Sequence, residues 1–152
     1  MTRLNVGDQC PLFSVKNKDG KEIKASDYIG KKPFVLFFFP NNIGYYCKSE
    51  VCEFRDAYEK FCEFGVEVIG ASPNSVESHN RFAEKHKIPF NLVVDEGRKL
   101  AKTFGVDGFL ITDRVTFIID ITGKIVFSHS ALLKSTQHIE ESLKLVETLS
   151  AN

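Results

Sequence analysis

The chain has 152 residues, a length typical of one domain that buries its own hydrophobic core. Twenty Lys and Arg balance twenty Asp and Glu, so the bulk charge gives no reason to expect a nucleic acid or an anionic membrane as partner. The longest apolar run, residues 34–39, is far shorter than the roughly 20 residues that span a bilayer. Pro40 ends this run, which indicates a buried strand.

Turn signals and hydrophobic periodicity predict the elements in chain order. Two short strands, 12–15 and 21–24, flank the turn sequence Asn-Lys-Asp-Gly at residues 17–20, which is typical of a hairpin. The remaining predicted elements are strand 34–39, helix 48–63, strand 66–70, helix 75–87, strand 91–94, helix 97–104, strands 115–119 and 124–128, and helix 135–149. Asn74 with Glu77 predicts a capping box for the second of these helices, and Asp95 predicts an N-cap for the third.

This order of elements predicts an α/β fold with a mixed central sheet flanked by helices on both faces. Together with the amino-terminal β-hairpin, it is thioredoxin-like. No linker, repeat or low-complexity stretch interrupts residues 1–152, so we expect a single domain over that whole length. The first ten residues lack the apolar core of a secretory signal, and we expect none, although a transit peptide removed earlier is compatible with the sequence.

Four cysteines, Cys10, Cys47, Cys52 and Cys62, are too few for a disulfide scaffold. We therefore expect the cytoplasm or another reducing compartment, an organelle included, where cysteines that matter are usually catalytic or metal-binding. Cys10 lies in a predicted loop and Cys62 at the edge of an apolar helix stripe. We expect both to fill space.

Cys47 is placed differently, because it follows Pro40 by seven residues, where a buried strand has ended and a helix begins. Ligands collect at the carboxyl ends of strands in sheets of this type. Cys47, Val51 and Phe54 share one helical stripe, with the cysteine at its amino-terminal end. Unpaired backbone N–H groups and the helix dipole favour a thiolate there. From this position alone, a buried structural thiol is an equal alternative.

The residues around Cys47 form a longer pattern. Pro40 precedes Cys47, a second cysteine follows five residues later, and Phe-Arg-Asp stands at residues 54–56. This stretch resembles the active-site segment of the peroxiredoxins, in particular the bacterioferritin-comigratory or Q subgroup, with its pattern Pro-x-x-x-Thr-x-x-Cys. Val-Gly-Asp-x-x-Pro-x-Phe at residues 6–13 and Arg-Val-Thr-Phe-Ile-Ile-Asp-x-x-Gly-Lys-Ile at residues 114–125 resemble other signatures of that family.

The resemblance implies a thiol-dependent peroxidase that reduces hydrogen peroxide and organic hydroperoxides. In that family, Cys47 corresponds to the peroxidatic cysteine, which becomes a sulfenic acid, and Cys52 to the resolving cysteine, which closes an intramolecular disulfide. Arg114 corresponds to the arginine that contacts the thiolate and the peroxide. Pro40 corresponds to the proline that shields the pocket, and Glu50 to a glutamate that supports the arginine.

The resemblance also implies which reductant, cofactor and oligomeric state to expect. Thioredoxin or a similar dithiol is the expected reductant, no metal or other cofactor is expected, and the chain is expected to work as a monomer or weak homodimer. A nucleic acid is not an expected partner, because basic and aromatic residues are not interleaved as nucleic-acid binding requires. A membrane is not expected either, because the bulk charge is balanced and the longest apolar run is too short to span one.

One residue departs from the family pattern. Gly44 stands where the family has a threonine whose hydroxyl hydrogen-bonds the peroxide. Loss of such a group costs about 2 to 4 kcal/mol of transition-state stabilisation. Slower turnover, a water in place of the hydroxyl and a rearranged loop are all consistent with this glycine.

Three other functions compete with the peroxidase. A copper carrier would use Cys47 and Cys52 with His129 or His138, since soft thiolates select Cu(I), but related carriers use Cys-x-x-x-Cys and this chain has one more residue between the cysteines. A disulfide oxidoreductase would require Cys-x-x-Cys. A binding module that has lost catalysis has only Gly44 in its favour.

Overall fold

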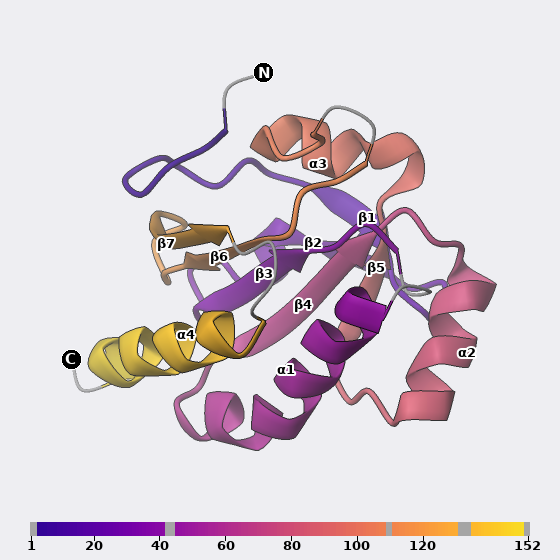
Figure 1. Ribbon diagram of the computed structural model, residues 1–152. Coiled ribbons are helices and arrows are strands. Elements are labelled where there is room, and N and C mark those ends of the chain that lie inside the picture. The colour runs from indigo at the N-terminus through magenta and orange to yellow at the C-terminus, as the bar shows by residue number, and fades with distance from the viewer. Residues whose placement is uncertain (1–2, 42–44, 109–110, 131–134, 151–152) are drawn as a thin grey trace.

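The computed structural model describes residues 3–41, 45–108, 111–130 and 135–150, and for residues 45–50, 135–139 and 149–150 the description is of the backbone. The helices and strands follow one another in the order that the sequence predicts (Figure 1). Along the chain they are β1 (Ser14–Lys16), β2 (Glu22–Lys24), the short 3₁₀ helix η1 (Ala25–Asp27), β3 (Phe34–Phe38), α1 (Tyr45–Glu63), β4 (Glu67–Ser72), α2 (Val76–His86), β5 (Asn91–Val94), η2 (Glu96–Arg98), α3 (Lys99–Phe104), β6 (Val115–Ile119), β7 (Ile125–Ser130) and α4 (Ser135–Ser150).

The central sheet has five strands in the order β5-β4-β3-β6-β7. β3, β4 and β5 are parallel to one another, whereas β6 is antiparallel to β3 and to β7. Every residue of β3 and of β6 is buried, as expected for strands covered on both faces. The carboxyl ends of β3, β4 and β5 therefore meet at one edge of the sheet, and β6 begins at that edge.

Alternate residues of β3 supply two separate cores. Val35, Phe37 and Phe39 face α1, α2 and α4, while Phe34, Leu36 and Phe38 face the amino-terminal segment and α3. Figure 1 shows α1 and α4 on one side of the sheet and α3 on the other. The sheet is thus a middle layer, and the side that carries α1 is the side where Cys47 lies.

Stacked aromatic rings attach α1 to the sheet. The Phe54 ring lies parallel to the Phe37 ring, with centroids 4.3 Å apart and planes at 12°, and contacts Phe61 at 5.9 Å. Phe37 has room for this packing because β4 carries Gly70, where an added Cβ would lie 2.6 Å from the Phe37 ring. Val51 and Phe54 are both fully buried, so the stripe predicted from the sequence is the face that α1 packs on the sheet.

Thioredoxin-like architecture, the mixed sheet and the amino-terminal strand pair are confirmed, and most element bounds agree within three residues. The capping prediction at Asn74 is wrong by one residue, because Ser75 is the N-cap of α2 and its Oγ accepts from the Ser78 N–H at 3.2 Å. Asp95 does satisfy the start of α3, accepting from the Leu100 N–H at 2.6 Å and the Ala101 N–H at 3.0 Å. The extra turn η2 lies between this carboxylate and the helix that it caps.

Candidate active site

The carboxyl end of β3 is the floor of the candidate site. The Phe39 N–H donates to the Ala71 carbonyl of β4 at 3.1 Å, so the backbone stays in the sheet for one residue beyond the strand. Pro40 follows and is buried. Because proline has no N–H to donate, the sheet pairing ends here and the chain is free to turn toward α1.

Cys47 lies in the first turn of α1, as the third residue of a helix that begins at Tyr45. The N–H groups of a first helical turn have no partner within the helix, and the helix dipole places partial positive charge there. Both favour a thiolate at this position. Glu50 also lies early in α1, while the position of Gly44 and the side chains of Cys47 and Glu50 are outside the described residues.

Arg114 reaches the same edge of the sheet through the register of β3 and β6. Phe38 of β3 is opposite Val115 of β6, and the two strands are antiparallel. Arg114 therefore lies directly before β6 at the level of Phe39, one residue from Pro40, and it is half-buried. Neighbouring strands are about 5 Å apart, so the backbone of Arg114 lies beside the end of β3.

Cys52 is on the same helix as Cys47, and it is a half-buried free thiol. Five residues of α-helix rise about 7.5 Å and rotate by about 500°, which separates the two Cα atoms by roughly 8 to 9 Å. Disulfides rarely join Cα atoms more than about 7 Å apart. The two cysteines therefore cannot be linked while α1 is intact.

The other two cysteines have different surroundings. Cys10 is buried, its thiol donates to the Pro11 carbonyl at 3.4 Å, and burial raises its pKa to about 12. A thiol in this state is a poor nucleophile, so Cys10 fills space as expected. Cys62 is exposed, so the expectation that it fills space at the edge of the apolar stripe is wrong.

A buried polar cluster at the end of β4 was not predicted from the sequence. His79 of α2 is fully buried, and its Nε2 lies 3.4 Å from both the Oγ and the carbonyl oxygen of Ser72. Burial lowers the pKa of His79, and backbone hydrogen bonds oppose that effect. Its ring contacts the Phe39 ring edge to face, with centroids 6.4 Å apart. The cluster is therefore next to Phe39, which directly precedes Pro40. A lone histidine on a helix carries no signal that would place it there.

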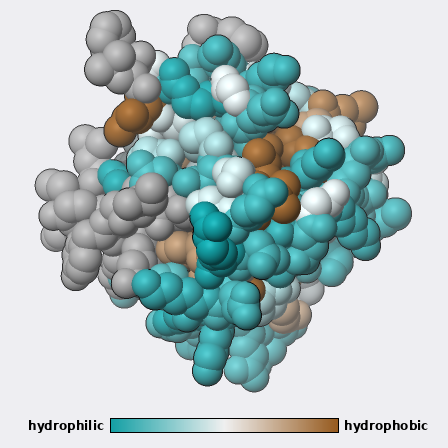
Figure 2. Space-filling view, turned by 90° about the vertical axis from the view of Figure 1, so that its right-hand side faces the viewer, coloured by the Kyte–Doolittle hydropathy of each residue, from teal (hydrophilic) through white to brown (hydrophobic). Residues whose placement is uncertain are grey.

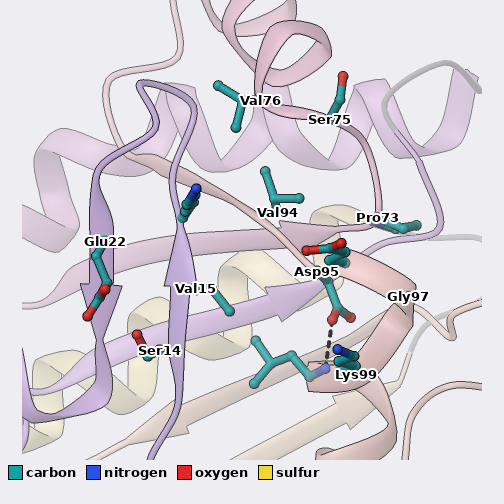
Figure 3. A pocket seen from close by; sticks show the side chains of 13 residues that line it. Ser14, Val15, Glu22, Pro73, Ser75, Val76, Val94, Asp95, Gly97 and Lys99 are labelled. Carbon is teal, nitrogen blue, oxygen red and sulfur yellow. Dashed lines mark hydrogen bonds between the residues drawn. The ribbon is translucent and has the colours of Figure 1, made fainter.

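A cavity of about 700 Å³ opens at another part of the same edge. It lies between β1, the ends of β4 and β5, the start of α2 and the start of α3, and its lining includes Val15, Val76, Val94 and Asp95 (Figure 3). The face of the molecule that includes α2 is largely hydrophilic with a small apolar group (Figure 2). None of the described residues that line this cavity belongs to β3 or α1.

The described residues contain no group of three His, Cys, Asp or Glu side chains arranged to hold a metal ion. His129, one of the histidines considered as a copper ligand, forms an ion pair with Glu141, with Nδ1 and Oε2 3.1 Å apart. Within the same described part of the chain, no helix has the length and apolarity needed to cross a membrane.

Topology and site together define a class of protein, the thioredoxin-like thiol peroxidases. In the present chain a cysteine lies at the start of the first long helix, and an arginine enters from the antiparallel neighbour of the preceding strand. This arrangement brings the backbone of a cysteine and that of an arginine to one edge of the sheet, and attack on a peroxide oxygen requires a thiolate with a cation beside it.

Comparison with known proteins identifies the family. The AhpC/TSA family profile matches residues 6–128. Peroxiredoxin Bcp of Bacillus subtilis is 36% identical over 155 residues, covering 97% of this chain and 98% of that protein. The chloroplastic peroxiredoxin Q of Populus jackii is 37% identical over 150 residues, covering 97% of this chain and 70% of that protein.

Among solved structures, peroxidoxin BcpB of Mycobacterium tuberculosis superposes with a TM-score of 0.90 at 28% identity, covering 97% of this chain and 99% of that one. A cysteine-to-serine variant of PrxQ from Xylella fastidiosa gives a TM-score of 0.89 at 27% identity over 99% of both chains. The chain belongs to the AhpC/TSA family, and it is a thiol-dependent peroxidase of the peroxiredoxin Q and Bcp type. A peroxide is its oxidising substrate and a thiol its reductant.

Proposed function

We propose that Cys47 is the peroxidatic cysteine and Cys52 the resolving cysteine of this peroxidase, and that residues 1–152 form the single domain in which both act. The observation that carries the proposal is the register of β3 and β6, which brings Arg114 to the edge of the sheet where Pro40 ends β3 and α1 begins. The backbone of Cys47, the half-buried Arg114 and the buried Pro40 all belong to that edge among the described residues.

In the first step, the Cys47 thiolate attacks one peroxide oxygen. The S–O bond forms as the O–O bond breaks, and the second oxygen leaves as water or an alcohol after taking up a proton. Arg114 stabilises the thiolate and the charge that develops on the departing oxygen, which is the largest contribution expected from the protein. Pro40 excludes water from one side of the sulfur, and Glu50 orients the guanidinium.

In the second step, Cys52 attacks the sulfenic acid of Cys47. The S–S bond forms, the S–O bond breaks and the oxygen leaves as water. Cys10 does not compete for the sulfenic acid, because it is buried on the other side of the sheet with a raised pKa. A dithiol such as thioredoxin then reduces the disulfide by thiol exchange.

We propose a reducing compartment, because catalysis returns to free thiols after each cycle. The named relatives include chloroplastic and bacterial proteins. Both the cytoplasm and an organelle are compatible with that requirement. A monomer is sufficient, since both cysteines belong to one helix, and a weak homodimer would not alter the chemistry.

A coupled assay with hydrogen peroxide, thioredoxin, its reductase and NADPH tests the assignment. Wild type should consume NADPH, whereas Cys47→Ser should be inactive. Cys52→Ser should show one rapid oxidation without turnover, and Cys62→Ser serves as the matched control and should keep the wild-type rate. Turnover by Cys47→Ser at the wild-type rate would refute the proposal.

A further inference from the structure

Arg55 is held by two contacts on the turn of α1 that follows Cys52. Its Nη1 donates to the His86 carbonyl at 2.6 Å, and its Nε donates to the Asp56 carboxylate at 2.9 Å. His86 is the last residue of α2, so its carbonyl belongs to the final turn, which has no partners within the helix and carries partial negative charge. Arg55 thus joins α1 to the carboxyl end of α2 at one defined point.

The same side chain lies close to Cys52. Residues three apart on a helix are neighbours on its surface, about 5 to 6 Å between Cβ atoms, and Cys52 and Arg55 have this spacing. The hydrogen bond to Asp56 raises the pKa of Arg55, and negative charge on Cys52 adds to that rise. The Arg55 side chain as a whole is 30% exposed.

Phe54 supplies a second attachment one residue before Arg55. Its ring is fully buried and stacks on Phe37 of β3 at 4.3 Å. The helix is therefore fixed to the sheet through Phe54 and to α2 through Arg55. Residues on the amino-terminal side of this pair can leave the helix without breaking either attachment.

We propose that Arg55 is a positioning residue for the resolving step. By joining α1 to the end of α2, it sets the point at which the opening of α1 stops, and it keeps a positive charge beside the Cys52 sulfur as that sulfur attacks the sulfenic acid. This inference rests on the proposed role of Cys52. It does not involve the first step, because Cys47 lies eight residues away, about 12 Å along the helix axis.

The experiment compares R55Q, R55K and the control R81Q, which alters an exposed arginine of α2, all with Cys10 and Cys62 replaced by Ser. One equivalent of hydrogen peroxide is added, the reaction is quenched at intervals, and sulfenic acid and disulfide are counted by mass spectrometry. R55Q should form sulfenic acid at the wild-type rate but close the disulfide about three- to fivefold more slowly. R55K, which keeps the charge but not the forked contact, should be intermediate, and R81Q should match wild type.

Amide exchange of the oxidised proteins gives a second measurement. Fast exchange should stop near residue 54 in wild type and extend past residue 55 in R55Q. Disulfide closure in R55Q at the wild-type rate would overturn the inference, as would an equal slowing of sulfenic acid formation and disulfide closure. If R55Q does not fold, disulfide closure in R55K at the wild-type rate would overturn it. Failure of the proposed function is a different result, because Cys52→Ser that keeps Cys10 and Cys62 would then still form an intramolecular disulfide.

Discussion

Formation of the Cys47–Cys52 disulfide should open the start of α1. In an intact helix the two Cα atoms are roughly 8 to 9 Å apart, whereas a disulfide needs about 7 Å or less. The opening breaks about four helical hydrogen bonds, each contributing about 0.5 to 1.5 kcal/mol. It also exposes Val51, which is fully buried and contributes about 1.5 to 3 kcal/mol. The disulfide also restricts the unfolded chain, which offsets about 2 kcal/mol of this loss. The oxidised protein should therefore be less stable than the reduced protein by about 2 to 7 kcal/mol.

Amide hydrogen exchange and thermal unfolding measure this loss. Exchange should become faster between residues 47 and 54 on oxidation and stay unchanged in β3 and at Phe61, which remains packed on Phe54. Even the lower bound of about 2 kcal/mol corresponds to a melting temperature lower by about 4 to 8 °C in a chain of this size. Cys52→Ser treated with peroxide is the control and should show neither change. Equal protection of α1 and equal melting temperatures in the two redox states would refute the geometric argument.

Four further outcomes can be measured. Arg114→Ala should slow sulfenic acid formation at least tenfold in stopped-flow or quenched measurements of peroxide consumption. Arg114→Lys should recover only part of the rate, since a lysine lacks the forked donor set of arginine. An unchanged rate in Arg114→Ala would show that another group stabilises the peroxide. Gly44→Thr should accelerate the same step, because it restores the hydroxyl found in the family at that position, and a slower step would contradict this reading. Burial lowers the pKa of His79, so as the pH falls the unfolded chain takes up this proton at a higher pH, about 6.5, than the folded chain does. The melting temperature should therefore fall between pH 7 and pH 5, and more steeply than in His79→Gln. Gly70→Ala should lower the free energy of unfolding by about 1 to 3 kcal/mol in denaturant titration, because its Cβ would lie 2.6 Å from the Phe37 ring, and a neutral effect would mean that the ring can move aside.

Strong, local sequence signals predicted most of the fold. Both faces of the apolar run at residues 34–39 are hydrophobic, so the run can bury them only at the centre of a covered sheet. β3 lies at that place. The stripe containing Val51 and Phe54 predicted which face of α1 is buried, because helical spacing fixes that face before any tertiary contact is known. Asp95 was predicted to cap the helix that follows it, and it does so although η2 lies between the two. Its carboxylate reaches N–H groups five and six residues along the chain.

The remaining features depend on contacts between distant parts of the chain. Arg114 reaches the end of β3 only through an antiparallel register that no local pattern specifies, so its place was expected from family resemblance alone. His79 and Ser72 form a buried cluster across β4 and α2, and Arg55 meets the last carbonyl of α2. The N-cap of α2 is Ser75 and not the predicted Asn74. Asparagine and serine are about equally good N-caps, so the sequence alone does not show which of these two neighbours begins the helix.

The central claim is that Cys47 reacts with peroxide and Cys52 resolves the product. Its most direct test is peptide mapping of the protein after one equivalent of hydrogen peroxide, with free thiols alkylated and counted. We expect that two thiols per chain are lost and that one intramolecular disulfide joins the peptides containing Cys47 and Cys52. Cys10 and Cys62 should both be found alkylated, because they stay free thiols. A main disulfide that contains Cys10 or Cys62, or oxidation that spares Cys47, would contradict it.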